Sequence, residues 1–223
     1  MSRVLPILFN TEMVRAILDG EKSCTRRLVK PQQFTGLLPD KCKNAMPDEF
    51  LKQKNMMFKP YCDMTDSELI GAAYKPPYRA GDILYVRETW CDDRQFTHDS
   101  TPGRYFYKAS ESGNFKWKPS IHMPKEAARI WLRVTDVRVE RLQEITPKDA
   151  ESEGVGNLFY DDIGYSEKNY GTEVDPEYGI AKEQFAWLWE STIKKSDLDC
   201  YGWDANPYVW VISFERYEKP EGA

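Results

Sequence analysis

Residues 4–27 read VLPILFNTEMVRAILDGEKSCTRR and place a strand, a helix and a polar segment in direct succession. The apolar run Val4–Phe9 is typical of a short buried strand. Asn10 or Thr11 is suited to cap a helix whose apolar residues recur at helical spacing, and Gly20 is placed to end it. The polar segment after the glycine is predicted as a loop, which is a common place for binding and catalytic groups.

Four later segments have the patterns of strands. Residues 83–90 (ILYVRETW) are rich in β-branched and aromatic residues and follow a Gly-Asp turn signal. Residues 104–108 (RYFYK) and 207–217 (PYVWVISFERY) also predict strands. Residues 128–139 (ARIWLRVTDVRV) give the clearest pattern, and its change of phase at Asp136 indicates a β-bulge.

Two helices are predicted in the second half of the chain. Thr146 as cap and Pro147 at the first helical position predict a short helix that stops at Gly154. Residues 182–193 predict an amphipathic helix, whose inward face is made of Phe185, Leu188, Trp189 and Ile193. These helices are too few for a series of βαβ units, so we predict an α+β fold, a small mixed β-barrel with flanking helices.

Length and composition fit a single domain over residues 1–223 that carries two insertions. A chain of 223 residues buries enough surface to form a core without disulfides. The first insertion, at about residues 30–80, holds six prolines and little periodicity, with helices expected near 48–54 and 65–73. The second, at about residues 155–180, is acidic and rich in Gly and Tyr, which predicts a surface loop.

The charge distribution bounds the class of ligand. The formal net charge is −5, which counts against a protein that tracks many phosphates of a duplex. Residues 1–30 carry a local charge of +3, whereas residues 150–199 carry −8. The first segment is therefore the place where an anion is attracted. Seven Trp, thirteen Tyr and ten Phe also suit a base-stacking pocket, although a core position is the commoner role of each.

Cysteine and histidine usage argues against a metal site. The five cysteines are scattered with no CxxC, so neither a disulfide framework nor zinc-finger spacing is indicated. With two histidines, His98 and His122, we expect no metal and no cofactor. The six-residue apolar run near the N-terminus is too short for a signal peptide or a membrane span, so we expect a cytoplasmic protein without membrane contact.

The spacing Gly20-x-Lys22-x-x-Thr25-x-Arg27 is the most specific pattern in the chain. At the end of an N-terminal helix it resembles the signature of the ASCH family, whose barrel is PUA-like. Further features look like the same family: the Gly81-Asp82 turn before a strand, the Ala150-x-x-Glu153-Gly154 pattern and the apolar last strand. Residues 86–90, 119–124 and 201–207 resemble the larger ASCH proteins of phages and prophages.

This resemblance implies a role in RNA binding or processing. One bacterial branch of the family is a small amidohydrolase that removes the acetyl group from N4-acetylcytidine, with the signature Lys and Thr and a downstream Glu as active residues. Lys22 and Thr25 match the first two, and Glu153 is the best match for the third. The chain is much longer than that small enzyme, so its insertions bear on the shape of the pocket.

Elementary chemistry supports the same three residues. Amide hydrolysis needs a nucleophile, a proton acceptor and stabilisation of an oxyanion. A neutral Lys22 is one candidate base for the Thr25 hydroxyl, because burial or nearby cations favour the neutral amine. If Lys22 instead pairs with Glu153, the lysine stabilises the oxyanion and the glutamate is the base to Thr25 or to water. Cys24 lacks a neighbouring His that would make its thiolate, so we do not expect it to be catalytic.

Further residues are candidates for binding the substrate. Arg27, beside Arg26, is suited to hold a carbonyl or phosphate oxygen in a bidentate manner, or to form a salt bridge at the barrel edge. Trp90, Trp117 and Trp203 are candidates for a base-stacking wall, with Trp203 favoured because polar residues flank it. The remaining candidates are polar groups for a base edge or ligand contact: Glu88, His122 and Asn206.

Three functions follow as hypotheses. The first is a metal-independent amidohydrolase acting on an acylated nucleoside, with Lys22, Thr25 and Glu153 as the catalytic set. The second is a module that binds RNA or a modified base without turnover. The third is a phage accessory protein that binds a host protein through its insertions. The expected partners are a nucleoside or a short single-stranded RNA, and the expected state is a monomer or small homo-oligomer.

Overall fold

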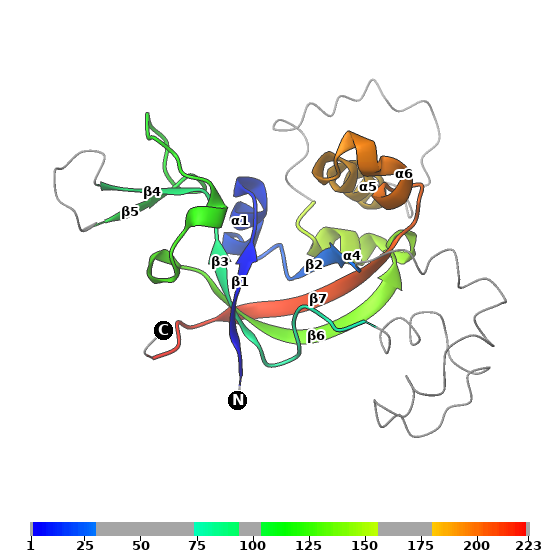
Figure 1. Ribbon diagram of the computed structural model, residues 1–223, viewed down its shortest axis with the longest axis horizontal. Coiled ribbons are helices and arrows are strands. Elements are labelled where there is room, and N and C mark those ends of the chain that lie inside the picture. The colour runs from blue at the N-terminus through cyan, green and yellow to red at the C-terminus, as the bar shows by residue number, and fades with distance from the viewer. Residues whose placement is uncertain (1, 30–73, 94–103, 156–179, 222–223) are drawn as a thin grey trace.

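A pair of long antiparallel strands, β6 (Trp131–Arg141) and β7 (Tyr208–Tyr217), forms the centre of the computed structural model (Figure 1). The structure describes residues 2–29, 74–93, 104–155 and 180–221. Among them, β1 (Val4–Leu8) pairs in parallel with β3 (Ile83–Arg87), and β3 pairs with β6. On the other side β7 pairs with β2 (Cys24–Leu28), which gives the order β1-β3-β6-β7-β2. A separate two-stranded sheet joins β4 (Trp90–Asp92) and β5 (Tyr105–Tyr107).

The described residues therefore form a mixed α+β fold, and the coarse fold class is confirmed. Within the described ranges the five-stranded sheet is open, with β1 and β2 as its edges. The two edges nevertheless meet at one point, because the Arg27 Nη2 atom on β2 donates to the Leu8 carbonyl on β1 at 2.9 Å. The cavity described below lies beside this contact.

Two details of the strands bear on the sequence-based predictions. The register of β6 against β7 shifts between Val134 and Asp136, which confirms the predicted bulge. The predicted strand 83–90 is in fact interrupted, and Trp90 begins β4 of the small sheet. At the interruption, Glu88 is engaged by other parts of the fold. Its backbone N–H donates to the Met123 sulfur, and its buried carboxylate is paired with Arg129.

Helices α1 and α4 begin at residues whose side chains cap them. Helix α1 (Thr11–Leu18) is capped by Asn10, whose side chain accepts from the Met13 N–H at 2.8 Å. Helix α4 (Pro147–Ser152) is capped by Thr146 and has Pro at its first position, as predicted. Helices α5 (Ile180–Thr192) and α6 (Leu198–Tyr201) follow, and short 3₁₀ turns occupy Ser120–His122, Lys125–Ala127, Leu142–Glu144 and Lys195–Asp197.

Two groups of buried apolar residues hold the helices against the sheet. The first joins α1 to β1, β3, β6 and β7, with Ile17, Leu84 and Ile212 almost fully buried. The second joins α4 and α5 to β7, with Phe185 and Val211 among its members. Figure 1 shows α1 and α5 on the same side of the β6–β7 pair, with β2 between them.

The segment predicted as a loop after the first helix is a strand instead. Residues 24–28 form β2, in which Thr25 pairs with Ile212. The ladder to β7 continues through the Ser23 carbonyl, which accepts from the Phe214 N–H at 2.8 Å. Sheet pairing satisfies the backbone groups of this polar stretch, and such tertiary pairing overrides its weak local signal.

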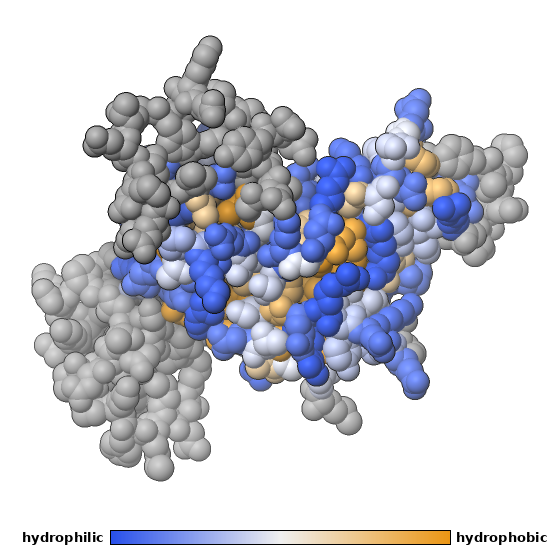
Figure 2. Space-filling view, turned by 180° about the vertical axis from the view of Figure 1, so that it is seen from behind, coloured by the Kyte–Doolittle hydropathy of each residue, from blue (hydrophilic) through white to orange (hydrophobic). Residues whose placement is uncertain are grey.

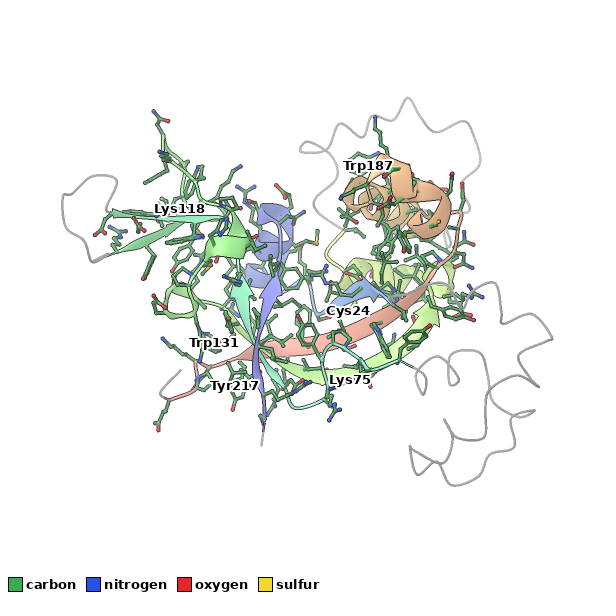
Figure 3. The ribbon with its side chains drawn as sticks, viewed as in Figure 1. Cys24, Lys75, Lys118, Trp131, Trp187 and Tyr217 are labelled. Atoms are coloured by element: carbon green, nitrogen blue, oxygen red, sulfur yellow. The ribbon has the colours of Figure 1, made fainter. Side chains whose placement is uncertain are left out.

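The surface of the described residues is mostly polar. In the view from behind, hydrophilic side chains cover much of that face, with apolar patches between them (Figure 2). The large exposed apolar side chains are spread over four elements: Val4 and Leu8 at the two ends of β1, Ile121 in a 3₁₀ turn, Trp187 on α5 and Tyr217 on β7. Trp187 extends from α5 away from the sheet (Figure 3). None of the helices in the described residues has the length and apolar character needed to span a membrane.

The helices expected near 48–54 and 65–73, and most of both predicted insertions, lie outside the described residues.

Candidate functional site

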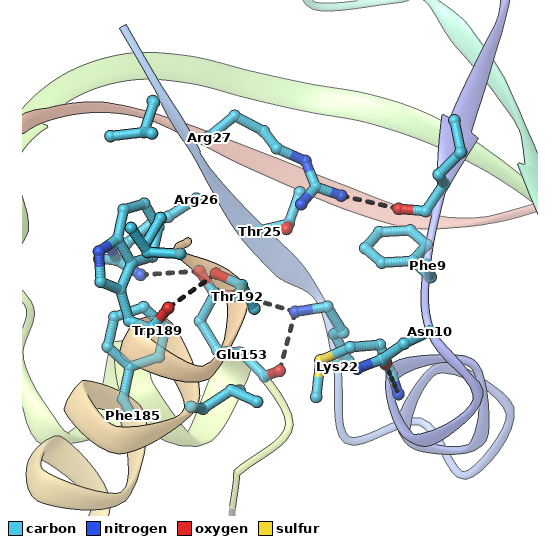
Figure 4. Close-up of a pocket in the computed structure, with 15 residues that line it drawn as sticks. Phe9, Asn10, Lys22, Thr25, Arg26, Arg27, Glu153, Phe185, Trp189 and Thr192 are labelled. Atoms are coloured by element: carbon cyan, nitrogen blue, oxygen red, sulfur yellow. Dashed lines mark hydrogen bonds and ion pairs between the residues drawn. The ribbon is translucent and has the colours of Figure 1, made fainter. Parts of the chain in front are cut away.

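A cavity of about 450 Å³ lies where the two edge strands approach each other. Residues at the end of β1 and in α1 line one side, β2 and Glu153 line the base, and α5 lines the other side (Figure 4). The volume falls within the range of pockets that bind small molecules and cofactors. It is the place where the predicted residues Lys22, Thr25 and Glu153 meet.

Lys22 is fixed by the turn that follows α1. The N–H groups of Glu21 and Lys22 both donate to the Ala16 carbonyl, at 2.9 and 3.0 Å. The next residue, Ser23, donates its N–H to the Ser152 carbonyl at the end of α4. The lysine therefore leaves the backbone between two helix ends, and its side chain is only 1% exposed.

The Glu153 carboxylate accepts a hydrogen bond from each of the two buried cations of the site, Lys22 and Arg26. Its Oε2 atom lies 2.6 Å from Lys22 Nζ, and its Oε1 atom lies 3.3 Å from Arg26 Nη1. The main-chain carbonyl of Glu153 also accepts from Lys22 Nζ at 2.8 Å. In Figure 4 the two cations approach the carboxylate from opposite sides. The glutamate side chain is 4% exposed, so the network is screened from bulk water.

Gly154 makes this close approach feasible. The residue has φ +84, a left-handed conformation that favours glycine. A Cβ atom at this position would lie 2.7 Å from Ala16 Cβ and 3.2 Å from Lys22 Cβ. The glycine thus lets α4 end against the start of the Lys22 side chain.

Thr25 lies on β2 with its side chain at the cavity. The residue is 3% exposed and pairs with Ile212 in the ladder. Because strand side chains alternate, Thr25 and Arg27 share one face of β2, as Figure 4 shows. Lys22 and Thr25 lie on different elements, since the turn after α1 carries Lys22 and β2 carries Thr25. The two residues still meet at the same cavity.

Arg26 was a candidate for substrate binding, and the structure gives it a supporting position. Its side chain is fully buried and its Nη2 atom lies 3.2 Å from Glu140 Oε2, besides the contact with Glu153. Its guanidinium also stacks over the Phe185 ring at 5.6 Å. The Nε atom of Arg26 is buried without a hydrogen-bond partner among the described residues. This arginine holds the Glu153 carboxylate in place.

Among the described residues, Arg27 has fewer partners than the other two cations of the cavity, Lys22 and Arg26. Its Nη2 atom donates to the Leu8 carbonyl, and its guanidinium lies 5.4 Å from the Phe9 ring centroid. Burial lowers the pKa of Arg27, against the opposing effect of the Glu153 carboxylate. Within the described ranges no carboxylate lies within 4.0 Å of it, in contrast to Lys22 and Arg26.

Cys24 has the environment of an inert thiol. It lies on β2 in the interior (Figure 3), and its Sγ atom is 3.8 Å from the Asp149 carbonyl of α4. Burial, and to a lesser degree the nearby Glu153 carboxylate, raise the pKa of the Cys24 thiol to about 12. The cations Lys22 and Arg26 act in the opposite direction without reversing the shift. A thiol that keeps its proton is a poor nucleophile, in agreement with the expectation from the sequence.

The aromatic wall of the cavity differs from the one predicted. Phe9, Phe185 and Trp189 line the cavity, and none of the three was a candidate for stacking. Phe9 ends the first apolar run, while Phe185 and Trp189 belong to the inward face predicted for 182–193. The one sequence signal for Phe185 and Trp189 as cavity residues was therefore the apolar face of α5. From the sequence alone, that face is equally consistent with a position in the core.

The predicted tryptophans lie elsewhere. Trp90 is 3% exposed and belongs to a third core group with Met123 and Trp131. Trp117 packs on Phe115 at 5.0 Å between ring centroids. Trp203 packs against Phe185 from behind, at 6.3 Å, so it supports the wall without lining the cavity. Their apolar surface is used in packing, which is the commoner role of tryptophan.

The other predicted polar contacts are also structural in their placement. Glu88 is 1% exposed, and its carboxylate oxygens each accept from Arg129 at 2.9 Å. Asn206, with φ +46, accepts from the Gln143 N–H at 2.9 Å and shapes the turn into β7. His122 is exposed at the end of a 3₁₀ turn. None of these three side chains lines the cavity, because each is held by a different part of the fold.

Side chains that could ligate a metal ion do not cluster in the described residues. In these residues no group of three or more His, Cys, Asp or Glu side chains is arranged to hold a metal ion. The carboxylates beside the cavity, Glu153 and Glu140, each face an arginine.

Comparisons with protein-family models, with curated proteins and with solved structures gave no match to this chain.

Proposed function

We propose that this protein is a metal-independent amidohydrolase that removes an acyl group from the amino nitrogen of a modified nucleoside, of the N4-acylcytidine type. The observation that carries the proposal is the convergence of Lys22, Thr25 and Glu153 at one cavity. These side chains come from the end of α1, from β2 and from the end of α4. A hydroxyl, an ammonium and a carboxylate are the groups that amide hydrolysis requires.

The ion pair supports one choice of proton roles within this proposal. Lys22 and Glu153 are 2.6 Å apart, which is the geometry of an ammonium on a carboxylate. Lys22 therefore serves as the cation that stabilises the oxyanion, and Glu153 serves as the base. The Thr25 hydroxyl attacks the acyl carbon, and Glu153 receives its proton. That proton passes to the leaving amine as the carbon–nitrogen bond breaks, and water then releases the acyl group from Thr25.

The walls of the cavity suit a nucleoside. Phe9 on one side and Phe185 and Trp189 on the other offer ring faces on which a base stacks. The volume of about 450 Å³ suits a ligand of this size and not a duplex. The edge strands that meet through Arg27 and Leu8 also support a PUA-like barrel, in which this contact bridges the seam.

The test is incubation of the purified chain with a panel of acylated nucleosides, read by mass spectrometry. We expect release of the free nucleoside from an N4-acylated cytidine, and no release by a Thr25→Val variant. Tight binding of the panel without turnover would replace this proposal with the non-catalytic reader of modified bases. Neither binding nor turnover of any member would leave the host-protein hypothesis as the one to pursue.

A further inference from the structure

The cations of the cavity are not equally neutralised. Lys22 has the Glu153 carboxylate at 2.6 Å. Arg26 has Glu153 at 3.3 Å and Glu140 at 3.2 Å. Arg27 has no carboxylate within 4.0 Å among the described residues, and its contacts are the Leu8 carbonyl and the Phe9 ring. Asp149 also lies 3.8 Å from Arg26, so three carboxylates lie near Lys22 and Arg26. Among the described residues, Arg27 is therefore the cation of the cavity that lacks a neighbouring carboxylate.

Arg27 is half-buried at the cavity, so its charge is partly removed from water and can still be reached by a ligand. A guanidinium removed from water loses solvation, and the lowered pKa of Arg27 has burial as its main cause. The carbonyl of Leu8 takes one of the five N–H donors of the side chain. The side chain is also held in one orientation by the Phe9 ring and by this hydrogen bond, so its remaining donors are preorganised beside the cavity.

We propose that Arg27 forms an anion subsite, so that the ligand of this cavity carries an oxyanion group in addition to the amide. The inference rests on the proposed function for the identity of the amide and goes beyond it in naming the charge of the substrate. A guanidinium binds planar or tetrahedral oxyanions through paired, charge-assisted N–H donors, which are stronger than its hydrogen bonds to the neutral carbonyl of a nucleoside.

Two sources supply such an oxyanion. One is a carboxylate at the far end of the acyl group, as in a succinyl amide. The other is the 5′-phosphate of a nucleotide. Arg27 shares its face of β2 with Thr25, two residues away, which is about 7 Å along a strand. The carboxylate of a succinyl group would therefore lie near the attacked carbonyl, whereas a 5′-phosphate would lie across the sugar from it. Ligands that differ only in one of these anionic groups distinguish the two sources.

The experiment measures binding, with calorimetry or the total tryptophan fluorescence as the readout, since Trp189 lines the cavity. The probes are two matched pairs: cytidine with cytidine 5′-monophosphate, and N4-acetylcytidine with N4-succinylcytidine. We expect the anionic member of one pair to bind the unaltered protein about tenfold or more tightly than its neutral twin, the difference that one charge-assisted contact provides. The pair that shows the difference identifies the source of the anion.

Variants assign the effect to the residue. Arg27→Gln is expected to abolish the preference, and Arg27→Lys to keep part of it because the charge remains. Arg15→Gln removes the same charge from α1, where the guanidinium donates to the Ala109 carbonyl outside the cavity, and is expected to keep the full preference. Each variant is checked by urea unfolding, and Arg27→Lys serves if Arg27→Gln does not fold.

The proposal is overturned if both twins of each pair bind the unaltered protein equally, if no probe binds, or if Arg27→Gln leaves the preference intact. Hydrolysis of neutral and anionic substrates at equal rates and affinities would overturn the subsite and leave the amidohydrolase proposal standing. If the unaltered protein prefers the anionic probes, Arg27→Gln abolishes that preference and no probe is hydrolysed, the anion subsite stands and the amidohydrolase proposal falls.

Discussion

Lys22 and Glu153 are 131 positions apart in the sequence and touch twice, through the glutamate carboxylate at 2.6 Å and through its main-chain carbonyl at 2.8 Å. The contact ties the turn after α1 to the end of α4. It joins the fold to the proposed chemistry, since the same two groups stabilise the cavity and would stabilise charge during the reaction.

Glu153→Gln is expected to lower both stability and activity. The substitution leaves the Lys22 ammonium without a carboxylate and Arg26 with Glu140 as its nearest one. Removing one member of a buried ion pair costs about 3–5 kcal/mol. Urea unfolding of the variant, with hydrolysis measured at a temperature where it is folded, checks both effects.

A double variant separates the structural role of this pair from its chemical role. Lys22→Met combined with Glu153→Gln removes the uncompensated ammonium, so stability is expected to recover relative to Glu153→Gln alone. Activity is expected to stay absent, because neither the proposed base nor the proposed oxyanion-stabilising cation is present. Activity that returns together with stability would show that the pair is structural only.

Thr25→Val is expected to abolish hydrolysis with little change in stability. Valine keeps the shape of the side chain and its strand propensity while it removes the hydroxyl that the mechanism uses as nucleophile. We expect a loss of about 10³-fold or more in kcat and a stability change within about 1 kcal/mol. Thr25→Ser is the matched control and is expected to retain measurable turnover. Equal activity of the Val variant and the unaltered protein would remove Thr25 from the mechanism.

Gly154→Ala is expected to disturb Lys22, and Gly81→Ala provides the matched control. Both glycines have left-handed backbones, with φ +84 and φ +85. A Cβ at Gly81 would meet nothing within 4 Å, whereas at Gly154 it would lie 2.7 Å from Ala16 Cβ. We expect Gly81→Ala to cost about 1–2 kcal/mol for the backbone alone, and Gly154→Ala to cost about 1–3 kcal/mol more. Activity should fall only in the second variant, and equal effects in both would argue against a role for the close approach.

The regular elements were predictable because their signals are local. The cap at Asn10, the Thr146-Pro147 start of α4 and the bulge near Asp136 each depend on residues close in sequence. The strand over residues 24–28 was missed for the opposite reason. Its polar sequence has no strand periodicity, and it is held by pairing with β7, almost 190 positions further along.

The candidate site was predictable only in part. Lys22, Thr25 and Glu153 were found through a pattern of spacing, and the structure brings them together. The aromatic wall was not found, because Phe185 and Trp189 have the same helical spacing as core residues. Glu88 and Trp90 were misplaced since polar or aromatic character alone does not reveal a buried ion pair or a core position. Long-range pairing, such as that of Arg26 with Glu140, has no local signature.

The Cys24 thiol is expected to make stability depend on pH in the alkaline range. Its pKa is raised from an ordinary value of 9.0 to about 12, mainly by burial. Above pH 9 the unfolded chain loses this proton while the folded protein keeps it, so the folded state loses stability as the pH rises. The contribution is about 1.4 kcal/mol per pH unit between these two values. Cys24→Ala should remove this slope, which urea unfolding between pH 8 and about pH 10.5 will show. If the free energies of unfolding of Cys24→Ala and the unaltered protein change in parallel with pH, the burial of the thiol is contradicted. The activity of Cys24→Ala near pH 7 should equal that of the unaltered protein.

The salt dependence of binding is expected to be shallow, because the cavity offers one cation without a carboxylate partner among the described residues, Arg27. Each phosphate that a protein neutralises contributes roughly 0.7–0.9 to the slope of log affinity against log salt concentration. A ligand with a single oxyanion should therefore give a slope of magnitude below about 2, whereas a protein that tracks a long backbone gives about 5 or more. The titration compares a nucleotide, a short single strand and a duplex at several salt concentrations. A steep slope with tight duplex binding would contradict the small-ligand cavity and favour an RNA- or DNA-binding module. Since the net charge of the whole chain is −5, such a result would also require a basic surface that residues around Arg27 do not provide.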